Sequence, residues 1–513
     1  MQAEQDAPRG LLRSSAVVGS MTMLSRVLGL ARDVILAAVL GASANADAFF
    51  VAFKIPNFLR RLFAEGAFSQ AFVPVLAEQR EAGGAAAVRD FIDHVAGALA
   101  AVLVTLTTVT VLAAPLVAAI FAPGFIGQGE KFTLTADLIR ITFPYLMLIS
   151  FTGMCGAILN SYGRFAVPAF TPVLLNLSLI GAALVAAPHF AEPAFALAWG
   201  VLLAGVIQLL FQLPFLYRID LVPRPRWSLQ HAGVQQVLKL MIPALFGVSV
   251  SQLNLLLDTV LASFLPTGSV SWLYYSDRLT ELPLGVFGIA IATVILPTLA
   301  SHNVARRAES FSETVDWAMR LVLLVAVPAA VALILLAEPI LISLFHYGAL
   351  QERDIAMSAL SLKAYSLGLV PFMLIKILAP GFYARKDMVT PVRIGIYAMV
   401  ANMGLNVLFV LPLMLYYGAG HMGLALATSC SAILNAVLLL RGLLRAGVYS
   451  FGAHWLRFVL RLAVSTVAMT AVLVTLVPET DLWLAWGWLQ RGLGITLVCS
   501  AGVATYVIGQ MVC

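Results

Sequence analysis

The sequence predicts an all-α polytopic membrane protein with about 14 transmembrane helices, and three observations lead to this fold class. Of the 513 residues, 61% are hydrophobic and 11% are charged, whereas about 25% of the residues in a soluble domain are charged. The apolar stretches reach about 20 residues, which is enough for a helix to cross a bilayer, and they lack the alternation of barrel strands. The connections are short, so no large extramembrane domain is expected.

The apolar stretches give the predicted spans in chain order. They cover residues 14–40, 46–78, 90–121, 133–160, 165–187, 194–217, 234–264, 270–300, 314–345, 355–383, 391–415, 420–444, 456–477 and 489–511. The longest connection lies near residues 218–233 and contains three arginines.

Loop cations predict the orientation of these spans. With the N-terminus in the cytoplasm, the cytoplasmic loops hold most of the loop arginines, and the outer loops hold little beyond Lys131 and Arg353. Cytoplasmic loops are typically enriched in Lys and Arg, and an even number of spans then places both termini in the cytoplasm. These loops also account for the net charge of +6, so we expect no nucleic-acid partner.

The chain also repeats itself at an offset of roughly 220–225 residues. The matching segments are Phe72–Glu78 with Ile295–Ser301, Asp33–Ala37 with Asp258–Ala262, and Tyr162–Arg164 with Tyr383–Arg385. Each repeat holds six spans, and an even number preserves orientation, so the repeats are parallel. We therefore predict a first lobe over residues 1–225, a second lobe over 226–450, and two further spans over 451–513. Two such lobes suit alternating access.

Catalytic motifs are absent from the sequence. It has no P-loop, no HExxH, no G-x-S-x-G and no Gly-rich dinucleotide turn. The four cysteines lack metal or redox spacing. The sequence therefore predicts a transporter without a cofactor rather than an enzyme.

The most informative feature is a set of charged residues within the apolar spans. They are Arg26, Arg32, Asp33, Lys54, Arg60, Arg61, Glu65, Asp277, Arg278, Glu281 and Lys376. A charge at mid-bilayer depth costs about 2.5–3.5 kcal/mol on insertion scales. Such residues usually face a bundle interior or a watery cavity, which indicates that something polar enters this protein.

Mutual neutralisation is the alternative explanation for these charges. Three pairs are close enough on one helix, namely Arg26 with Asp33, Arg61 with Glu65, and Arg278 with Glu281. Four cations have no obvious local partner: Arg32, Lys54, Arg60 and Lys376. A binding cavity is the better interpretation, because buried ion pairs are often no more stable than apolar replacements.

The residue type indicates the ligand. Arginine grips phosphate with a planar fork and stays ionised at any relevant pH. Several arginines in one aqueous cavity suit a phosphate or pyrophosphate group and would repel a cationic drug. Gly29 lies between two of these arginines and Pro56 precedes a third, so the helices could kink and act as hinges there, although ordinary packing of membrane helices explains a single Gly or Pro equally well.

A second polar set predicts a sodium or proton site. Asp258 lies within the seventh span, Asn402 and Asn406 share a face of the eleventh, and Thr428 lies in the twelfth. Carboxylate, amide and hydroxyl oxygens could hold a sodium ion or exchange a proton. The same residues could equally be polar contacts between helices.

Several motifs resemble the MurJ (MviN) lipid II flippase family. They are Ser25–Gly29 with Arg32 and Asp33, the run Asp47–Pro74, Tyr274–Leu279 and Leu378–Arg385. The run over 47–74 is long and specific, and the resemblance covers nearly the whole chain.

The resemblance implies a fold of the multidrug/oligosaccharidyl-lipid/polysaccharide exporter type. It also implies that lipid II, the undecaprenyl-pyrophosphate-linked peptidoglycan precursor, moves from the cytoplasmic to the periplasmic leaflet of a bacterial inner membrane. By resemblance, the cavity arginines correspond to Arg26, Arg32, Arg60 and Arg278, with Lys54, Arg61 and Lys376 as further substrate-binding residues. Residues 451–513 are expected to form a groove for the lipid tail.

Five acidic residues are predicted to gate the cavity or to pair with its cations: Asp33, Asp47, Glu65, Asp277 and Glu281. The coupling ion stays open between sodium, a proton and the membrane potential alone. Other cell-wall synthesis proteins are possible partners beside lipid II and membrane lipids. The rival functions are a flippase for another polyprenyl-linked glycan and a drug/cation antiporter of the same fold.

Overall fold

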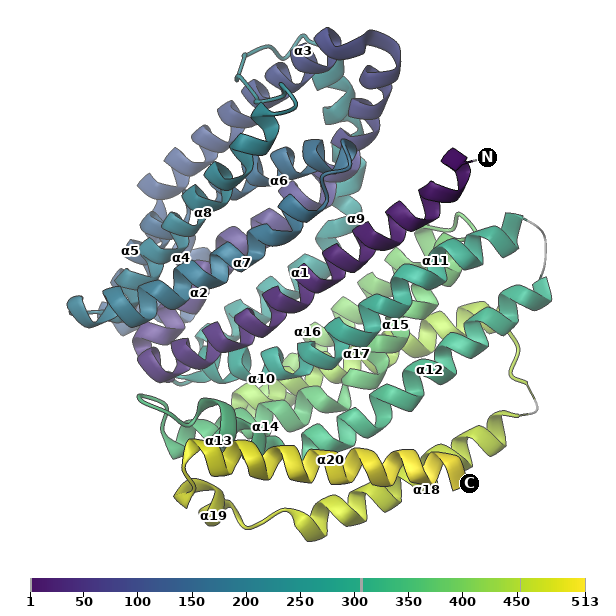
Figure 1. The fold of residues 1–513 in the computed structure, drawn as a ribbon. Coiled ribbons are helices and arrows are strands. Elements are labelled where there is room, and N and C mark those ends of the chain that lie inside the picture. Colours follow the sequence, from purple (N-terminus) through teal and green to yellow (C-terminus); the bar gives the residue numbers. More distant parts are fainter. Residues whose placement is uncertain (1, 305–307, 453, 513) are drawn as a thin grey trace. The chain divides into compact units, whose positions relative to one another are not determined.

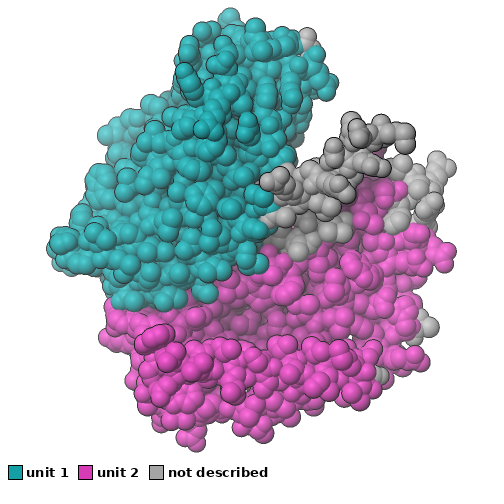
Figure 2. Space-filling model, viewed as in Figure 1, with its two compact units in different colours: residues 1–268 teal, residues 269–513 magenta. Residues whose placement is uncertain are grey.

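The computed structural model describes the backbone of residues 2–304, 308–452 and 454–512. It describes their side chains except for residues 2–16, 63–65, 82, 246–251, 288–290, 292–294, 302–304 and 308. Helices form nearly all of the described chain, and the described residues contain no strand. The chain divides into two compact units, residues 1–268 and 269–513 (Figures 1 and 2).

The first unit contains nine α-helices and several short π or 3-10 turns among the described residues. The helices are α1 (Gln2–Leu40), α2 (Ala44–Leu59), α3 (Ser69–Leu112), α4 (Ala114–Phe121), α5 (Glu130–Thr142), α6 (Tyr145–Ser161), α7 (Ala166–Gly181), α8 (Pro193–Tyr217) and α9 (Ala232–Ser263). The short turns are η1 (Arg60–Phe68), η2 (Pro123–Gln128), η3 (Ala182–Ala186) and η4 (Ala187–His189). Gly84 interrupts α3 with a positive φ of 68°, a conformation that glycine adopts without steric cost.

The second unit contains the remaining helices of the described chain. They are α10 (Ser269–Pro283), α11 (Ile289–Val304), α12 (Ala308–Leu335), α13 (Ala337–Phe345), α14 (Glu352–Leu367), α15 (Leu369–Tyr383), α16 (Val389–Tyr417), α17 (Gly420–Arg445), α18 (Trp455–Leu476), α19 (Thr480–Ala485) and α20 (Trp488–Val512), with the π-helical turn η5 (Leu284–Gly288) between α10 and α11. In this unit α18 and α20 lie side by side and pack on α12 and α13 (Figure 1).

The fold class predicted from the sequence is confirmed. Ten helices or helix pairs of the described residues are long and apolar enough to cross a membrane. The four other predicted spans, residues 14–40, 46–78, 234–264 and 270–300, are also helical. They are less apolar because they carry most of the intramembrane charges.

The sequence repeat and the division into compact units assign the helix α9 to different halves of the chain. It opens the predicted second lobe, yet Val234 and Val237 of α9 join the same apolar cluster as Phe72 and Phe91 of α3. The centroids of these two phenylalanine rings lie 5.5 Å apart in a stacked arrangement. Burial of this apolar surface accounts for the grouping of α9 with the first unit. The lobe boundary at 225/226 stays a prediction from the repeat.

The helix geometry differs at the two positions where the sequence left a kink open. The helix α1 continues through Gly29, because a single glycine weakens a helix without ending it. After Pro56 the chain winds into the π-helical turn η1, which begins at Arg60. The second unit has a π-helical turn, η5, directly after Pro283. Wider turns of this kind occur often at functional sites.

Candidate functional site

Arg32 is the centre of a buried polar cluster in the first unit. It lies on α1, which runs beside α7 (Figure 1), and only 8% of its surface is exposed. Its Nε and Nη2 atoms donate to Asp33 Oδ1 at 2.9 and 2.7 Å, and Nη1 donates to Asn176 Oδ1 at 2.9 Å. Asn176 Nδ2 in turn donates to the carbonyl of Ser25 at 2.9 Å. The cluster therefore fixes α1 against α7.

The geometry of Arg32 corrects one expectation from the sequence. The sequence showed no obvious local partner for Arg32, and the alternative of mutual neutralisation paired Asp33 with Arg26. Neighbours at i,i+1 point about 100° apart on a helix, but the long arginine side chain curls back and reaches Asp33. The buried ion pair needs further hydrogen bonds to be stable, and Asn176 supplies one.

Arg26 lies on the same helix in a different electrostatic setting. It is half-buried. Its side chain forms no hydrogen bond or ion pair with the residues that the structure describes. An arginine carries five N–H donors and keeps its charge when it is removed from water. The donors of Arg26 are therefore not used by any residue that the structure describes.

Asp47 is paired at the N-terminal end of α2, and 1% of its surface is exposed. Its Oδ2 atom accepts from Lys131 Nζ at 2.9 Å and from the Gly268 amide at 2.8 Å. The Lys131 ammonium also lies 4.1 Å from the centroid of the Phe125 ring, a favourable cation–π distance. Asp47 therefore ties α2 to α5 and to the end of the first unit.

The charged run after Lys54 is more exposed. Lys54 and Arg61 are exposed, whereas Arg60 is half-buried at the start of η1. The side chain of Glu65 lies outside the described residues, so its pairing with Arg61 stays a prediction. The π-helical turn rotates Arg60 and Arg61 relative to a regular helix, because each residue advances by a smaller angle.

In the second unit, Arg278 pairs with its own helix. Its Nη1 atom lies 2.9 Å from Glu281 Oε2, and its Nη2 atom lies 3.9 Å from Asp277 Oδ2. The guanidinium also lies 5.1 Å from the centroid of the Tyr274 ring. The i,i+3 pair expected from the sequence is therefore formed. Lys376 lies exposed on α15.

The predicted sodium or proton set is divided between the two units. Asn402 and Asn406 are buried on α16, which packs along α17, where Thr428 is half-buried. Asp258 is half-buried on α9 of the first unit. The joint coordination of an ion by these four residues stays a prediction.

Sequence reasoning missed two residues that complete the clusters. Asn176 was set aside because its glycosylation sequon lies within a span, and Lys131 was treated only as a loop cation. An amide in the middle of an apolar span signals a partner on another helix. A lysine that is 5% exposed signals a counter-ion, because lysine is almost never fully buried without a partner.

Replacing Asn176 by Ala is expected to lower the free energy of unfolding by about 1–3 kcal/mol, because a buried guanidinium donor loses its acceptor. Thermal unfolding of the detergent-solubilised chain measures this loss. Asn160→Ala is the matched control, since Asn160 is exposed, and its effect should stay within about 0.5 kcal/mol. Equal melting temperatures for the two variants would show that the Asn176 contacts contribute nothing.

Comparison with known proteins places the chain in a family. The family model described as "Lipid II flippase MurJ" matches residues 36–489. A Vibrio cholerae protein named "Probable lipid II flippase MurJ" is 49% identical over 98% of this chain and 96% of its own length. The "Lipid II flippase MurJ" of Burkholderia cenocepacia is 44% identical over 90% of this chain and 89% of its own.

Solved structures agree with these relationships. A structure named "Lipid II flippase MurJ, inward closed conformation" matches with a TM-score of 0.80 at 26% identity, over 96% of this chain and 98% of that chain. A multidrug resistance MATE transporter of the MOP superfamily matches with a TM-score of 0.69 at 16% identity, over 84% of this chain and 98% of that chain, which shows a shared fold. The chain belongs to the MurJ lipid II flippase family.

Proposed function

We propose that this chain moves lipid II, an undecaprenyl-pyrophosphate-linked disaccharide-peptide, from the cytoplasmic to the periplasmic leaflet of a bacterial inner membrane. The observation that carries the proposal is the full-length relationship to the MurJ lipid II flippases. Members of this family are transporters and not enzymes, which agrees with the absence of catalytic motifs from the sequence. We also propose that both termini lie in the cytoplasm, as the loop cations predict.

The physical problem for such a transporter is the polar headgroup. Its pyrophosphate and sugars would lose their hydration in hydrocarbon. The free energy of moving an unpaired charge out of water far exceeds the free energy gained from an apolar contact. Guanidinium groups replace that water with charge-assisted hydrogen bonds. The polyprenyl tail stays in lipid, and rocking of the two lobes exposes the headgroup site to the opposite side.

The proposed roles of the arginines differ because their partners differ. Arg26 binds the pyrophosphate directly, because its fork has no acceptor in the described chain. Arg278 is held by Glu281 and Asp277 until a pyrophosphate competes for it. Arg32 reaches the substrate only when it gives up Asn176, since its other nitrogens bond Asp33.

The remaining charged residues receive secondary roles in this proposal. Arg60, with Lys54 and Arg61, recruits the headgroup at the portal where the tail enters, and Lys376 adds positive charge from the second unit. The membrane potential favours outward movement of an anionic headgroup by about 2.3 kcal/mol per charge per 100 mV. A sodium ion or a proton at Asp258 is the alternative source of coupling.

Depletion of the chain, followed by leaflet-resolved quantification of polyprenyl lipids, tests the proposed substrate. Lipid II should accumulate in the cytoplasmic leaflet, and cells should swell and lyse. If a different polyprenyl-linked glycan accumulated while lipid II stayed unchanged, that glycan and not lipid II would be the substrate. If a cationic drug accumulated instead, the antiporter alternative would hold, although an arginine-rich site repels cations.

A further inference from the structure

The connector between α8 and α9 is fixed to α3 by one buried carboxylate. Asp93 is 2% exposed, and its Oδ1 atom accepts from the Arg224 amide at 2.8 Å. The Arg226 amide donates to the Asp93 carbonyl at 2.9 Å. An added Cβ at Gly97 would lie 2.1 Å from the Arg226 carbonyl oxygen, so only glycine permits this approach.

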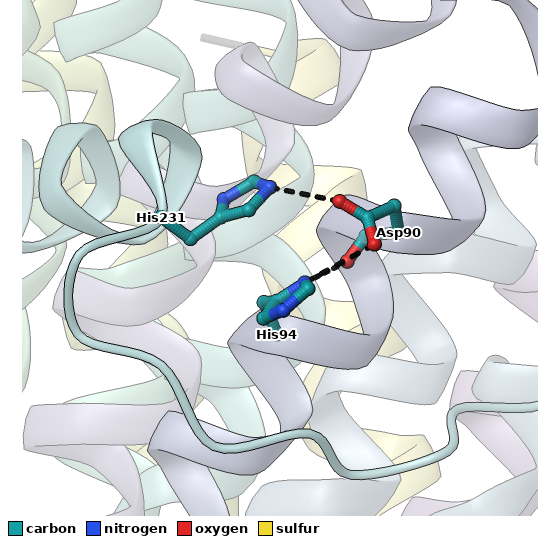
Figure 3. A group of neighbouring side chains, drawn as sticks. All are labelled: Asp90, His94 and His231. Atoms are coloured by element: carbon teal, nitrogen blue, oxygen red, sulfur yellow. Dashed lines mark hydrogen bonds and ion pairs between the residues drawn. The ribbon is translucent and has the colours of Figure 1, made fainter.

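A second cluster lies beside this contact and uses different groups. Figure 3 shows Asp90 and His94 from α3 facing His231, which caps the N-terminus of α9. Asp90 Oδ2 lies 3.1 Å from His231 Nε2, and Asp90 Oδ1 lies 3.4 Å from His94 Nδ1. The two imidazole rings stack with their centroids 4.6 Å apart and an interplanar angle of 13°. All three residues are half-buried.

The second repeat provides an internal comparison. The number of residues from Asp93 to Asp316 equals the number from His231 to His454. Asp316 and His454 are therefore the counterparts of Asp93 and His231 in the second repeat. Asp316 accepts from Tyr449, His454 and Trp455, and it pairs with Arg320 at 2.9 Å. The carboxylate is thus saturated by its own unit.

The same comparison shows what is particular to the first unit. At the offset that relates Asp93 to Asp316, Glu313 and Trp317 stand where the first repeat has Asp90 and His94. Asp93 binds the backbone of the connector, so this backbone contact does not need Asp90, His94 or His231.

We propose that Asp90, His94 and His231 form a binding site for a divalent transition metal ion of the zinc type. Imidazole nitrogens and a carboxylate oxygen are the ligands that zinc prefers, at about 2.0–2.2 Å from the ion. One ligand atom from each residue lies within 4.8 Å of the others, so small side-chain rotations bring them to one ion. Asp90 is 48% exposed, and water completes the coordination.

Zinc binding must break some of the hydrogen bonds and ion pairs that these residues make. His231 Nδ1 accepts from the Gly233 amide at 3.1 Å, so the ring proton is on Nε2 and faces Asp90. A zinc ion on Nε2 takes the place of that proton. The neutral ring then carries its proton on Nδ1, so Nδ1 can no longer accept a hydrogen bond from the Gly233 amide. The Arg226 guanidinium, 3.8 Å from Asp90 Oδ1 and 60% exposed, swings into water.

The consequence is a link between metal binding and the first helix of the second repeat. The ion would bridge α3 and the start of α9, two elements that already meet through apolar side chains and through the hydrogen bond from Gln236 to Glu78. This site uses none of the residues proposed to bind lipid II, so it stands whether or not lipid II is the substrate.

Equilibrium dialysis of the untagged full-length chain against zinc chloride, followed by elemental analysis, tests the site. We expect one zinc ion per chain, and a weakening of at least about tenfold in Asp90→Asn and in His94→Asn. His454→Asn is the matched control from the second repeat and should bind zinc as the unsubstituted chain does.

Thermal unfolding in the same samples separates binding from folding. Zinc should raise the melting temperature of the unsubstituted chain and of His454→Asn, because a ligand that binds only the folded state stabilises it. For Asp90→Asn, the melting temperature with zinc should equal the melting temperature with a chelator. The proposal is overturned if the unsubstituted chain retains no more zinc than the Asp90→Asn/His94→Asn double variant, or if His454→Asn loses as much.

Discussion

Cells that carry Arg26→Ala as the only copy of this chain should fail to build their wall, while the variant protein folds and inserts normally. The side chain of Arg26 has no acceptor in the described chain, so its removal breaks no internal hydrogen bond. It does remove a fork of donors that a pyrophosphate would need. Arg26→Lys should restore growth only in part, because an ammonium keeps the charge but cannot bind bidentately.

Complementation of a depletion strain, together with the amount and melting temperature of each variant in membranes, measures this prediction. Arg164→Ala is the matched control, since it removes an exposed loop arginine and should support normal growth. If Arg26→Ala grew as well as Arg164→Ala, the assignment of Arg26 to the substrate would be wrong.

Replacing Asp47 by Ala should cause the largest loss of stability, about 3–5 kcal/mol, because it leaves the buried Lys131 ammonium without its counter-ion. The side chains of Lys131 and Asp47 are 4% and 1% exposed, so water cannot take the place of the carboxylate. The Gly268 amide loses an acceptor in the same variant.

The double variant Asp47→Ala/Lys131→Met tests whether the unpaired charge causes this loss. It removes the charge and keeps an apolar side chain of similar length beside Phe125, so most of the stability should return. Thermal unfolding of the three proteins in one detergent gives the comparison. A double variant as unstable as the single one would show that the ion pair is not the cause.

Hydrophobicity along the chain was sufficient to predict the helices. Each of the 14 predicted spans coincides with helical structure, because a membrane requires every backbone group to be bonded within a helix. The sequence also pointed to the charged spans. What it did not reveal is the partner of each charge, since the pairing of Arg32 with Asn176 joins residues that are far apart in the sequence.

A local rule failed where side-chain length mattered more than position on the helix. Helical spacing favoured Arg26 as the partner of Asp33, but Arg32 is close enough to bend back onto it. The repeat places α9 in the second lobe, whereas the apolar contacts of Val234 and Val237 join it to the first compact unit, and the lobe boundary itself stays a prediction. By contrast, the i,i+3 spacing of Arg278 and Glu281 predicted their contact, because both lie on one helix.

The affinity of the purified chain for lipid II, compared with that of Arg26→Ala, tests the central claim most directly. The account predicts that Arg26→Ala binds lipid II about tenfold more weakly or worse, since a charge-assisted hydrogen bond contributes about 1.5–3 kcal/mol. Undecaprenol, which lacks the pyrophosphate, should bind both proteins equally. Equal affinity of the two proteins for lipid II would contradict the account.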